Sequence, residues 1–196
     1  MASKRVIIVA GPSGTGKTTI CRALAKKHKL RFVSGSRVFK KLLKKKNAKD
    51  WFAESKVKEG IMRERLKDYS FDELVDKEME REARKGNVVL DSRTLPWLVD
   101  FGFKVWLEAS PLARAKHIAE NEGIPKSKIP EMVKSMNLRD KNDLKIYKKL
   151  YGFDLKPDSR VFNLIVRNGG LSIRENIALV DEAVSSYLKA ERVGKR

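Results

Sequence analysis

The residues with the clearest chemical potential form a glycine-rich segment between residues 11 and 18, with the sequence GPSGTGKT. It fits the phosphate-binding pattern G-x-x-x-x-G-K-[ST] at every fixed position. Its glycines allow successive backbone N–H groups to point at phosphate oxygens, and a following helix adds the positive end of its dipole. The segment predicts a site for ATP. The expected binding residues are Gly11, Pro12, Ser13, Gly14, Thr15, Gly16, Lys17, Thr18 and Thr19.

Three residues at the end of this segment have distinct expected roles. Lys17 is expected to reach the β- and γ-phosphates, Thr18 to ligate the Mg²⁺ that accompanies ATP, and Thr19 to donate to a neighbouring phosphate. A glycine-rich turn that matches by chance is the alternative. The context favours the phosphate site, because the aliphatic run 6–10 precedes the loop and an apolar helical stripe follows it.

The elements that must position this loop alternate between strands and helices. Apolar runs predict strands at 6–10, 30–33, 87–91, 104–108 and 161–166. Helical patterns fill most of the intervals, and capping boxes at Ser70–Glu73 and Ser172–Glu175 predict two helix starts. This order predicts an α/β fold with a parallel β-sheet core flanked by helices.

Composition limits the classes of protein that remain. A chain of 196 residues with 41% hydrophobic content predicts one domain over 1–196. No signal peptide or membrane-spanning segment is recognisable, so we expect a cytoplasmic protein. The single cysteine, Cys21, excludes an internal disulfide, and the two histidines lack metal-ligand spacing.

The charge is strongly positive, with 44 Lys and Arg against 25 Asp and Glu and a formal net charge of +19. One interpretation is contact with RNA or a ribosome through a basic surface; the other is a lysine-rich surface suited to solubility or high temperature. Charge alone does not separate them. The surface proposed for RNA consists of Lys44, Lys45, Lys46, Lys141, Lys145, Lys148 and Lys149.

Further motifs, in their order along nearly the whole chain, accompany the phosphate loop. The chain resembles the archaeal-type cytidylate kinases. The segments that carry this resemblance are Ser34-Gly35-Ser36-Arg37-Val38-Phe39-Lys40, Asp91-Ser92-Arg93, Arg139 and Tyr147-x-x-x-Tyr151-Gly152-Phe153-Asp154. The resemblance implies a nucleoside monophosphate kinase whose core binds ATP and Mg²⁺. A helical insertion at about 35–86 would hold CMP or dCMP, and a lid at about 124–152 would close with arginines.

The resemblance also implies roles for individual residues. Asp91 would orient the Mg²⁺ beside Thr18, Arg93 would grip the monophosphate, and Arg139 would be the first lid arginine. The alternatives are a strand-end hydrogen bond, a surface salt bridge and a solvated helix charge. The remaining implied residues are Ser34, Ser36 and Lys40 at the acceptor nucleotide and Arg114 near the lid hinge.

The chain departs from the family pattern at several of these places. Lys40 replaces an arginine, so a point charge stands where a bidentate fork is usual. Ile146 replaces the second lid arginine and cannot bind phosphate, which leaves Lys145 or Lys148 as candidate substitutes. Asn163 and Arg167 replace an expected Asp and Asn.

The first hypothesis is ATP- and Mg²⁺-dependent phosphoryl transfer to a pyrimidine monophosphate, CMP or dCMP, with Lys17, Arg93 and Arg139 as catalytic residues. An adenylate-type or broad nucleoside monophosphate kinase is the enzymatic alternative. A nucleic-acid- or ribosome-associated P-loop NTPase with weakened kinase activity is the alternative from another class, and Ile146 and the net charge favour it. A shikimate-type kinase is less favoured, because Gly35-Ser36-Arg37 lacks paired acids.

Overall fold

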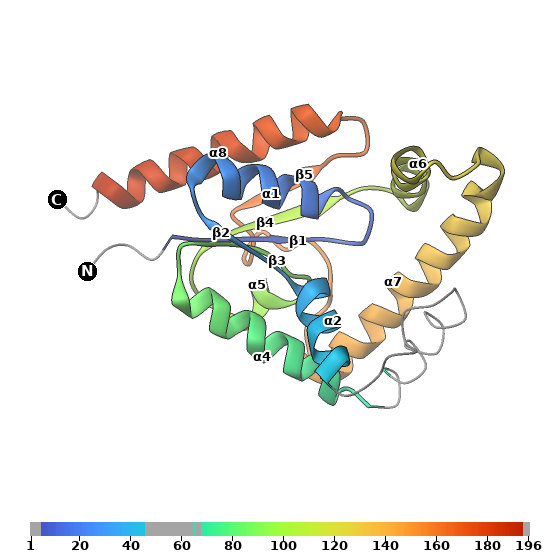
Figure 1. Ribbon diagram of the computed structural model, residues 1–196, viewed down its shortest axis with the longest axis horizontal. Helices are drawn as coiled ribbons and strands as arrows, with labels where there is room; N and C mark the ends of the chain where they lie inside the picture. The colour runs from blue at the N-terminus through green and yellow to red at the C-terminus, as the bar shows by residue number, and fades with distance from the viewer. Residues whose placement is uncertain (1–4, 46–64, 66–67, 194–196) are drawn as a thin grey trace.

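The computed structural model describes residues 5–45, 65 and 68–193 (Figure 1). Its strands are β1 (Val6–Ala10), β2 (Arg31–Ser34), β3 (Val88–Asp91), β4 (Phe103–Glu108) and β5 (Leu164–Arg167). Its helices are α1 (Lys17–His28), α2 (Gly35–Lys45), α4 (Ser70–Lys85), α5 (Leu95–Leu98), α6 (Pro111–Glu122), the 3₁₀ turn η2 (Lys126–Lys128), α7 (Ile129–Tyr151) and α8 (Ile173–Val193). No described helix is long and apolar enough to cross a membrane.

The five strands form one parallel sheet in the order β2-β3-β1-β4-β5. The predicted α/β architecture is therefore confirmed. The fifth strand was predicted over 161–166, and its first three residues are wrong. Residues 161 and 162 belong to a turn, because the backbone N–H groups of Val161 and Phe162 both donate to the carbonyl of Asp158, at 2.9 and 3.0 Å.

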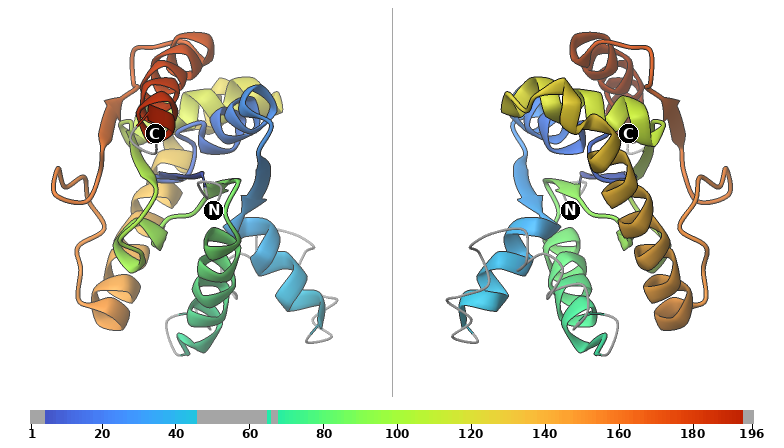
Figure 2. Two further views of the ribbon diagram at one scale, coloured as in Figure 1. Left: turned by 90° about the vertical axis from the view of Figure 1, so that its left-hand side faces the viewer. Right: turned by 90° about the vertical axis from the view of Figure 1, so that its right-hand side faces the viewer.

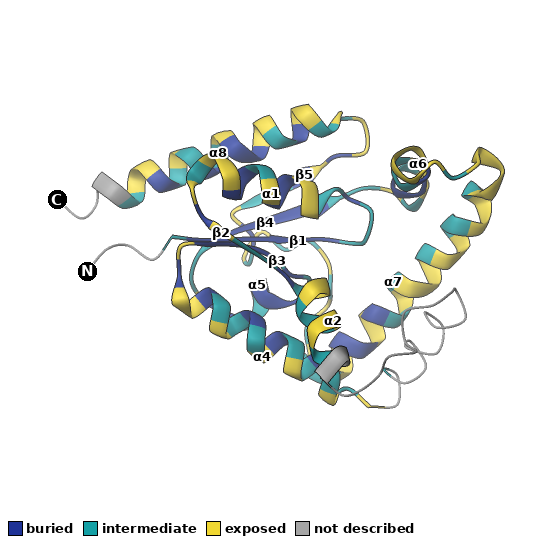
Figure 3. Cartoon of the chain, in the orientation of Figure 1, coloured by how far each residue is buried: buried dark blue, intermediate teal, exposed yellow. Residues whose placement is uncertain are grey.

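Helices cover both faces of the sheet (Figure 3). The side chains of β1 alternate between these two faces. Ile7 and Val9 pack with α1 and α8, whereas Val6 and Ile8 pack with α4 and α5. Successive side chains of a strand point to opposite faces, so a strand buried on both sides reads as a continuous apolar run. The loop that follows β1 consequently starts from a strand that is buried on both faces.

The two predicted capping boxes had different outcomes. At α8 the box is present: the N–H of Ser172 donates to Glu175 Oε2 at 2.7 Å, and the N–H of Glu175 donates to Ser172 Oγ at 3.3 Å. At α4 the prediction is wrong, because Ser70 is the first helical residue and Tyr69 precedes it. The N–H of Ser70 instead donates to Asp68 Oδ1 at 2.9 Å.

Two helical arms project from the same side of the sheet (Figure 2). One consists of α2 and α4, and the other is the long helix α7. A ring stack holds the end of α7 against the core: Phe153 stacks on Trp97 at 4.7 Å between centroids and on Tyr151 at 5.6 Å. The arms and the loop after β1 frame the candidate site.

Candidate active site

The phosphate loop needs glycine at positions where the backbone is unusual or crowded. Gly11 has φ +134°, and a Cβ there would lie 2.2 Å from the carbonyl oxygen of Leu107. Gly16 has φ +82° and is the residue from which α1 begins. Residues that carry a side chain rarely adopt these φ values, so the geometry of the loop explains the fixed glycines of the motif.

The loop is held by side chains that donate to its carbonyl groups. Pro12 O accepts from Thr15 Oγ1 at 3.0 Å and from Lys17 Nζ at 2.6 Å. Asn168, which follows β5, donates its Nδ2 to the carbonyl of Thr15 at 2.8 Å. None of these three bonds uses a backbone N–H group of the loop, so the bonds that hold its shape do not compete with a bound phosphate.

The ammonium group of Lys17 lies inside the curve of the loop rather than in bulk solvent. Burial lowers its pKa to about 8, although the nearby carboxylate of Asp91 opposes this effect. Negative charge placed beside a poorly hydrated ammonium would raise its pKa again. The position of Lys17 therefore favours an anionic ligand.

Thr18 and Asp91 meet at the carboxyl ends of the central strands. Thr18 Oγ1 donates to Asp91 Oδ2 at 2.6 Å, and Asp91 pairs in register with Val9 of β1. Hydroxyl and carboxylate oxygens are the ligands that Mg²⁺ prefers, and it commonly takes only one or two protein ligands beside substrate phosphates. No group of three or more His, Cys, Asp or Glu gathers elsewhere in the described residues as a metal site. This oxygen pair fits Mg²⁺ held together with a nucleotide.

Arg93 connects the phosphate loop to α7. It follows β3 by two residues, and its NH2 donates to Ser13 Oγ at 2.8 Å. Its NH1 pairs with Asp143 of α7. One guanidinium thus contacts both the phosphate loop and α7.

Two further guanidinium groups approach the same carboxylate. Arg65 places NH1 3.2 Å from Asp143 Oδ1, and Arg139 places Nε 3.8 Å from Asp143 Oδ2. Asp143 has only 1% of its side chain exposed. Arg65, Arg93 and Arg139 around Asp143 are called the arginine cluster below.

Additional hydrogen bonds fix Arg65 in the arginine cluster. Its NH2 donates to Asp72 Oδ1 at 2.6 Å and its Nε to Asp72 Oδ2 at 3.0 Å. Its NH2 also lies 3.1 Å from the hydroxyl of Tyr147, which donates to Asp72 at 3.2 Å. Residue 65, α4 and α7 are joined by this network.

Burial and like charges lower the pKa of Arg93 and Arg139 in the arginine cluster, whereas the hydrogen bonds with Asp72 raise the pKa of Arg65 against its burial. Burial and the charge of Arg65 lower the pKa of Arg93, and partial burial with the charges of Arg93 and Arg65 lowers that of Arg139. Guanidinium groups nevertheless stay protonated in proteins. Three charged forks around one carboxylate form a site that would gain from further negative charge.

Arg114 makes a second link between the loop and α7. It is 2% exposed, its NH1 donates to the carbonyl of Ser13 at 2.9 Å, and it pairs with Asp140. Gly14 lies against it, since a Cβ at position 14 would be 3.1 Å from Arg114 Cβ. Arg114, expected near a lid hinge, thus contacts both the phosphate loop and α7.

The expected acceptor residues lie on the other side of Asp91. Ser34 ends β2, is buried, and pairs in register with Asp91. Its Oγ is 2.9 Å from Oγ of Ser36. Lys40 is exposed on α2, four residues beyond Ser36. The hydroxyl groups of the two serines are therefore adjacent, and Lys40 lies farther along α2.

The structure explains in part why the chain departs from the family pattern at position 146. Ile146 is fully buried, so its side chain packs in the interior and does not line a phosphate site. Of the candidate substitutes, Lys145 is exposed and Lys148 pairs with Asp154 at 3.1 Å. Arg65 supplies a guanidinium that the sequence analysis did not single out. Its partner Asp143 is 78 residues away, so no local pattern could have identified it.

A buried acid lies behind the arginine cluster. Asp76 accepts from Thr94 at 2.5 Å and from Tyr151 at 2.8 Å, and burial raises its pKa to about 6. Both donors flank the site, since Thr94 directly follows Arg93 and Tyr151 ends α7. These bonds, like the ring stack, position α7 relative to the core.

The comparisons with known proteins agree with this geometry. Residues 7–147 match the family described as AAA domain. The cytidylate kinase of Ignicoccus hospitalis is 34% identical over 163 residues, 82% of this chain and 88% of the relative. That of Methanocorpusculum labreanum is 32% identical over 187 residues, 94% of this chain and 99% of the relative. The chain belongs to the cytidylate kinase family.

Solved structures support the fold of this cytidylate kinase family member. A shikimate kinase from Bacteroides thetaiotaomicron superposes with a TM-score of 0.55 at 17% identity, over 96% of this chain and 98% of that chain. This likeness concerns the fold alone. The predicted resemblance is confirmed, and the chain is a P-loop kinase.

Proposed function

We propose that this kinase transfers the γ-phosphoryl group of ATP to CMP or dCMP. The observation that carries the proposal is the position of Arg93, which contacts Ser13 of the phosphate loop on one side and Asp143 of the arginine cluster on the other. A phosphoryl group passing between the two nucleotides must cross this junction. The names of the relatives, 29–34% identical, support cytidine as the base.

The donor half is built for a triphosphate. Backbone N–H groups of 11–16 and the start of α1 would bind the phosphates, and Lys17 would contact the β- and γ-phosphates. Thr18 and Asp91 would hold Mg²⁺, and Thr19, exposed at the start of α1, would donate to a neighbouring phosphate. When bound, Mg²⁺ neutralises part of the charge on the phosphates.

The acceptor half would bind the monophosphate through the arginine cluster. An acceptor phosphate is already an anionic nucleophile, so the reaction needs no general base. Arg93 and Arg139 would stabilise the charge that develops on the transferring group, as preorganised cations do. Ser34, Ser36 and Lys40 would line the acceptor nucleotide.

Arg65 compensates for Ile146 in this proposal. Arg65 reaches the carboxylate that Arg93 and Arg139 also approach. Its doubly bonded contact with Asp72 fixes the plane of the guanidinium, which suits the recognition of phosphate oxygens. The missing arginine of α7 is thus replaced by one from outside α7.

The domain boundaries proposed from the sequence accommodate these halves within a single domain over 1–196. The monophosphate-binding region would span about 35–86, including α2 and α4, and the lid about 124–152, including α7. Asp140 and Asp143 of α7 pair with Arg114 and Arg93 of the core. Lid movement would exchange these ion pairs for contacts with substrate.

A P-loop NTPase with weakened kinase activity remains the second candidate. Ile146 favours it, since a buried aliphatic side chain at a lid position removes one phosphate contact. The two functions differ in whether ATP cleavage depends on an acceptor.

An acceptor panel tests the proposal. ADP formation would be measured with ATP and Mg²⁺ plus CMP, dCMP, UMP, dTMP, AMP or GMP, beside a reaction without acceptor. We expect CMP or dCMP to increase the rate at least about 100-fold over the reaction without acceptor. A higher rate with AMP would indicate an adenylate-type or broad kinase, and equal rates with and without acceptors would indicate an NTPase.

A further inference from the structure

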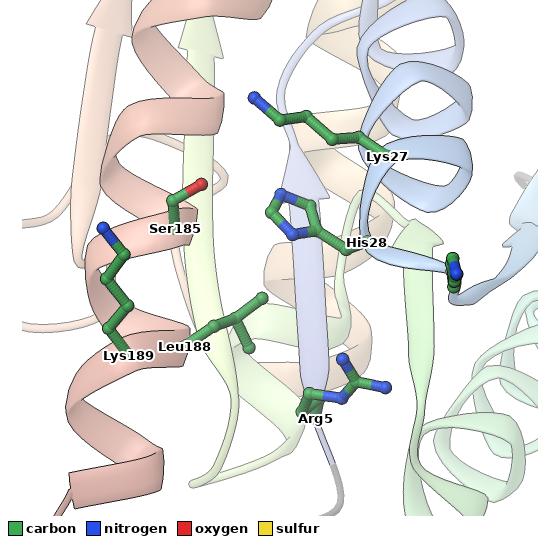
Figure 4. A pocket seen from close by; sticks show the side chains of 7 residues that line it. Arg5, Lys27, His28, Ser185, Leu188 and Lys189 are labelled. Atoms are coloured by element: carbon green, nitrogen blue, oxygen red, sulfur yellow. The ribbon is translucent and has the colours of Figure 1, made fainter.

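A hollow of about 350 Å³ lies between the end of α1 and α8, away from the candidate active site. Its basic lining residues are Arg5, Lys27, His28, Lys29 and Lys189, and no acidic residue lines it. Lys27 and His28 extend from α1 toward α8, where Ser185, Leu188 and Lys189 lie opposite (Figure 4).

The hollow lies far from the phosphate loop and takes no part in the proposed kinase reaction. Arg5 precedes β1 and His28 ends α1, whereas the phosphate loop joins the other end of β1 to the start of α1. The twelve residues of α1 separate the two places by about 18 Å. A ligand in the hollow would therefore lie at the amino ends of the strands, whereas the nucleotides would bind at their carboxyl ends.

Some of the charge in the hollow is already paired, and some is available. Lys27 and His28 contact the carboxylate of Asp181, at 2.5 and 2.8 Å. Lys29 and Lys189 are both exposed and form no ion pair within the part of the chain that the structure describes. These two lysines can accept an external anion without breaking an existing pair.

The positive charge continues beyond the hollow along the exposed face of α1. Arg22 and Lys26 are exposed and lie one turn apart, and Lys29 follows them. The seven residue-to-residue steps from 22 to 29 extend about 10 Å. A row of cations that leads into a basic hollow suits a chain of phosphates better than one small anion.

In the basic surface expected from the sequence, two lysines have partners among the described residues. Lys148 is paired with Asp154, and Lys149 lies over the ring of Tyr69 at 5.3 Å. Lys141 and Lys145 are exposed on α7. Lys46 and the side chains of Lys44 and Lys45 lie outside the described residues.

We propose that the hollow between α1 and α8 binds nucleic acid through its backbone phosphates, independently of base sequence. Lys29 and Lys189 are the principal contacts, and Lys26 and Arg22 extend the surface. This site is separate from the kinase site and does not depend on the identity of the acceptor nucleotide.

Two charge-reversal pairs test this proposal with the full chain. Lys29→Glu with Lys189→Glu alters the hollow, and Lys141→Glu with Lys145→Glu, on α7, is the matched control with the same change in net charge. Binding of a fluorescent mixed-sequence 20-nucleotide RNA, and of its DNA counterpart, would be measured by anisotropy from 50 to 300 mM KCl. Thermal unfolding and circular dichroism verify that each protein is folded.

We expect the hollow pair to weaken RNA and DNA binding at least tenfold, and the control pair to weaken it less than threefold. The slope of log affinity against log salt should decrease by about 1.4 for two lost phosphate contacts. Equal losses in the two pairs would overturn the proposal, because net charge alone would then account for binding. No binding by the wild-type chain at 50 mM KCl would overturn it as well. If Lys29→Glu with Lys189→Glu does not fold, Lys29→Gln with Lys189→Gln replaces it, with an expected loss of at least threefold and the same contradicting outcomes.

Discussion

The two halves of the candidate site are held together in different ways. The phosphate loop takes its shape mainly from glycine conformations and from local bonds such as Lys17 to Pro12, to which Asn168 and Arg114 add hydrogen bonds from distant parts of the chain. The arginine cluster combines residues from three distant parts of the chain, with Arg65 and Arg93 lying 78 and 50 residues from Asp143. Local backbone geometry dominates the first half, and long-range ion pairs dominate the second.

This difference suits the two tasks. A loop whose shape depends on backbone conformation can receive ATP with little rearrangement. In the proposed mechanism, substrate binding would exchange the carboxylate of Asp143 at the arginine cluster for a phosphate group. The ion pairs therefore provide order without substrate and can be replaced by it.

The largest effect should come from the loop. Lys17→Ala should reduce phosphoryl transfer about 1000-fold or more, because it removes a preorganised cation from the transferring phosphates. The thermal midpoint should change little, since Lys17 contributes little packing. Lys26→Ala, on the exposed side of the same helix, is the control and should retain turnover. Near-normal turnover by a folded Lys17→Ala protein would contradict the assigned role.

Arg93→Ala should have the next largest effect, lowering kcat/KM for the monophosphate about 100-fold. KM for CMP should rise and kcat should fall, whereas direct binding of ATP, measured by calorimetry, should change less than threefold. An equal loss of ATP affinity would assign Arg93 to the donor half, to which its bond with Ser13 also connects it.

Arg65→Ala should act on the acceptor half alone, with an increase in KM for CMP of about tenfold. Arg81→Ala is its control, since Arg81 is exposed on α4 and pairs only with Glu78 among the described residues. Steady-state kinetics with varied CMP at saturating ATP would measure the change. An unchanged KM would leave Arg65 as a structural partner of Asp72 and remove the proposed compensation for Ile146.

Asp143→Asn should have the smallest effect on turnover. Unlike the other substitutions, it should strengthen the binding of an inorganic anion. It removes the anion shared by three guanidinium groups, so the free energy of unfolding should fall by about 3 kcal/mol. Inorganic phosphate should then raise the thermal midpoint of the variant more than that of the wild type. Asp154→Asn, at an exposed residue just beyond α7, should show the wild-type response. Equal phosphate responses in all three proteins would contradict the proposed exchange of anions.

How far the sequence predicted the molecule follows the same division. The loop residues and the α/β fold follow from local patterns, because a strand, a glycine-rich turn and a helix are adjacent in the chain. Asp91 lies 73 residues from Thr18, and only the resemblance to the cytidylate kinases placed it beside Thr18. Arg65 could not be predicted, since its partners are determined by the packing of α4 and α7. The capping box at Ser70 and the start of the strand at 161 were wrong because nearby Asp68 and Asp158 supplied competing hydrogen bonds.

The most direct test of the account follows the phosphoryl group itself. ATP labelled with ³²P at the γ-position would be incubated with CMP, Mg²⁺ and the wild-type chain, and the products would be separated by thin-layer chromatography. We predict that the label appears in CDP in a one-to-one ratio with the ADP formed, and that Arg93→Ala slows this transfer. Label released as inorganic phosphate, at a rate independent of CMP, would contradict the account.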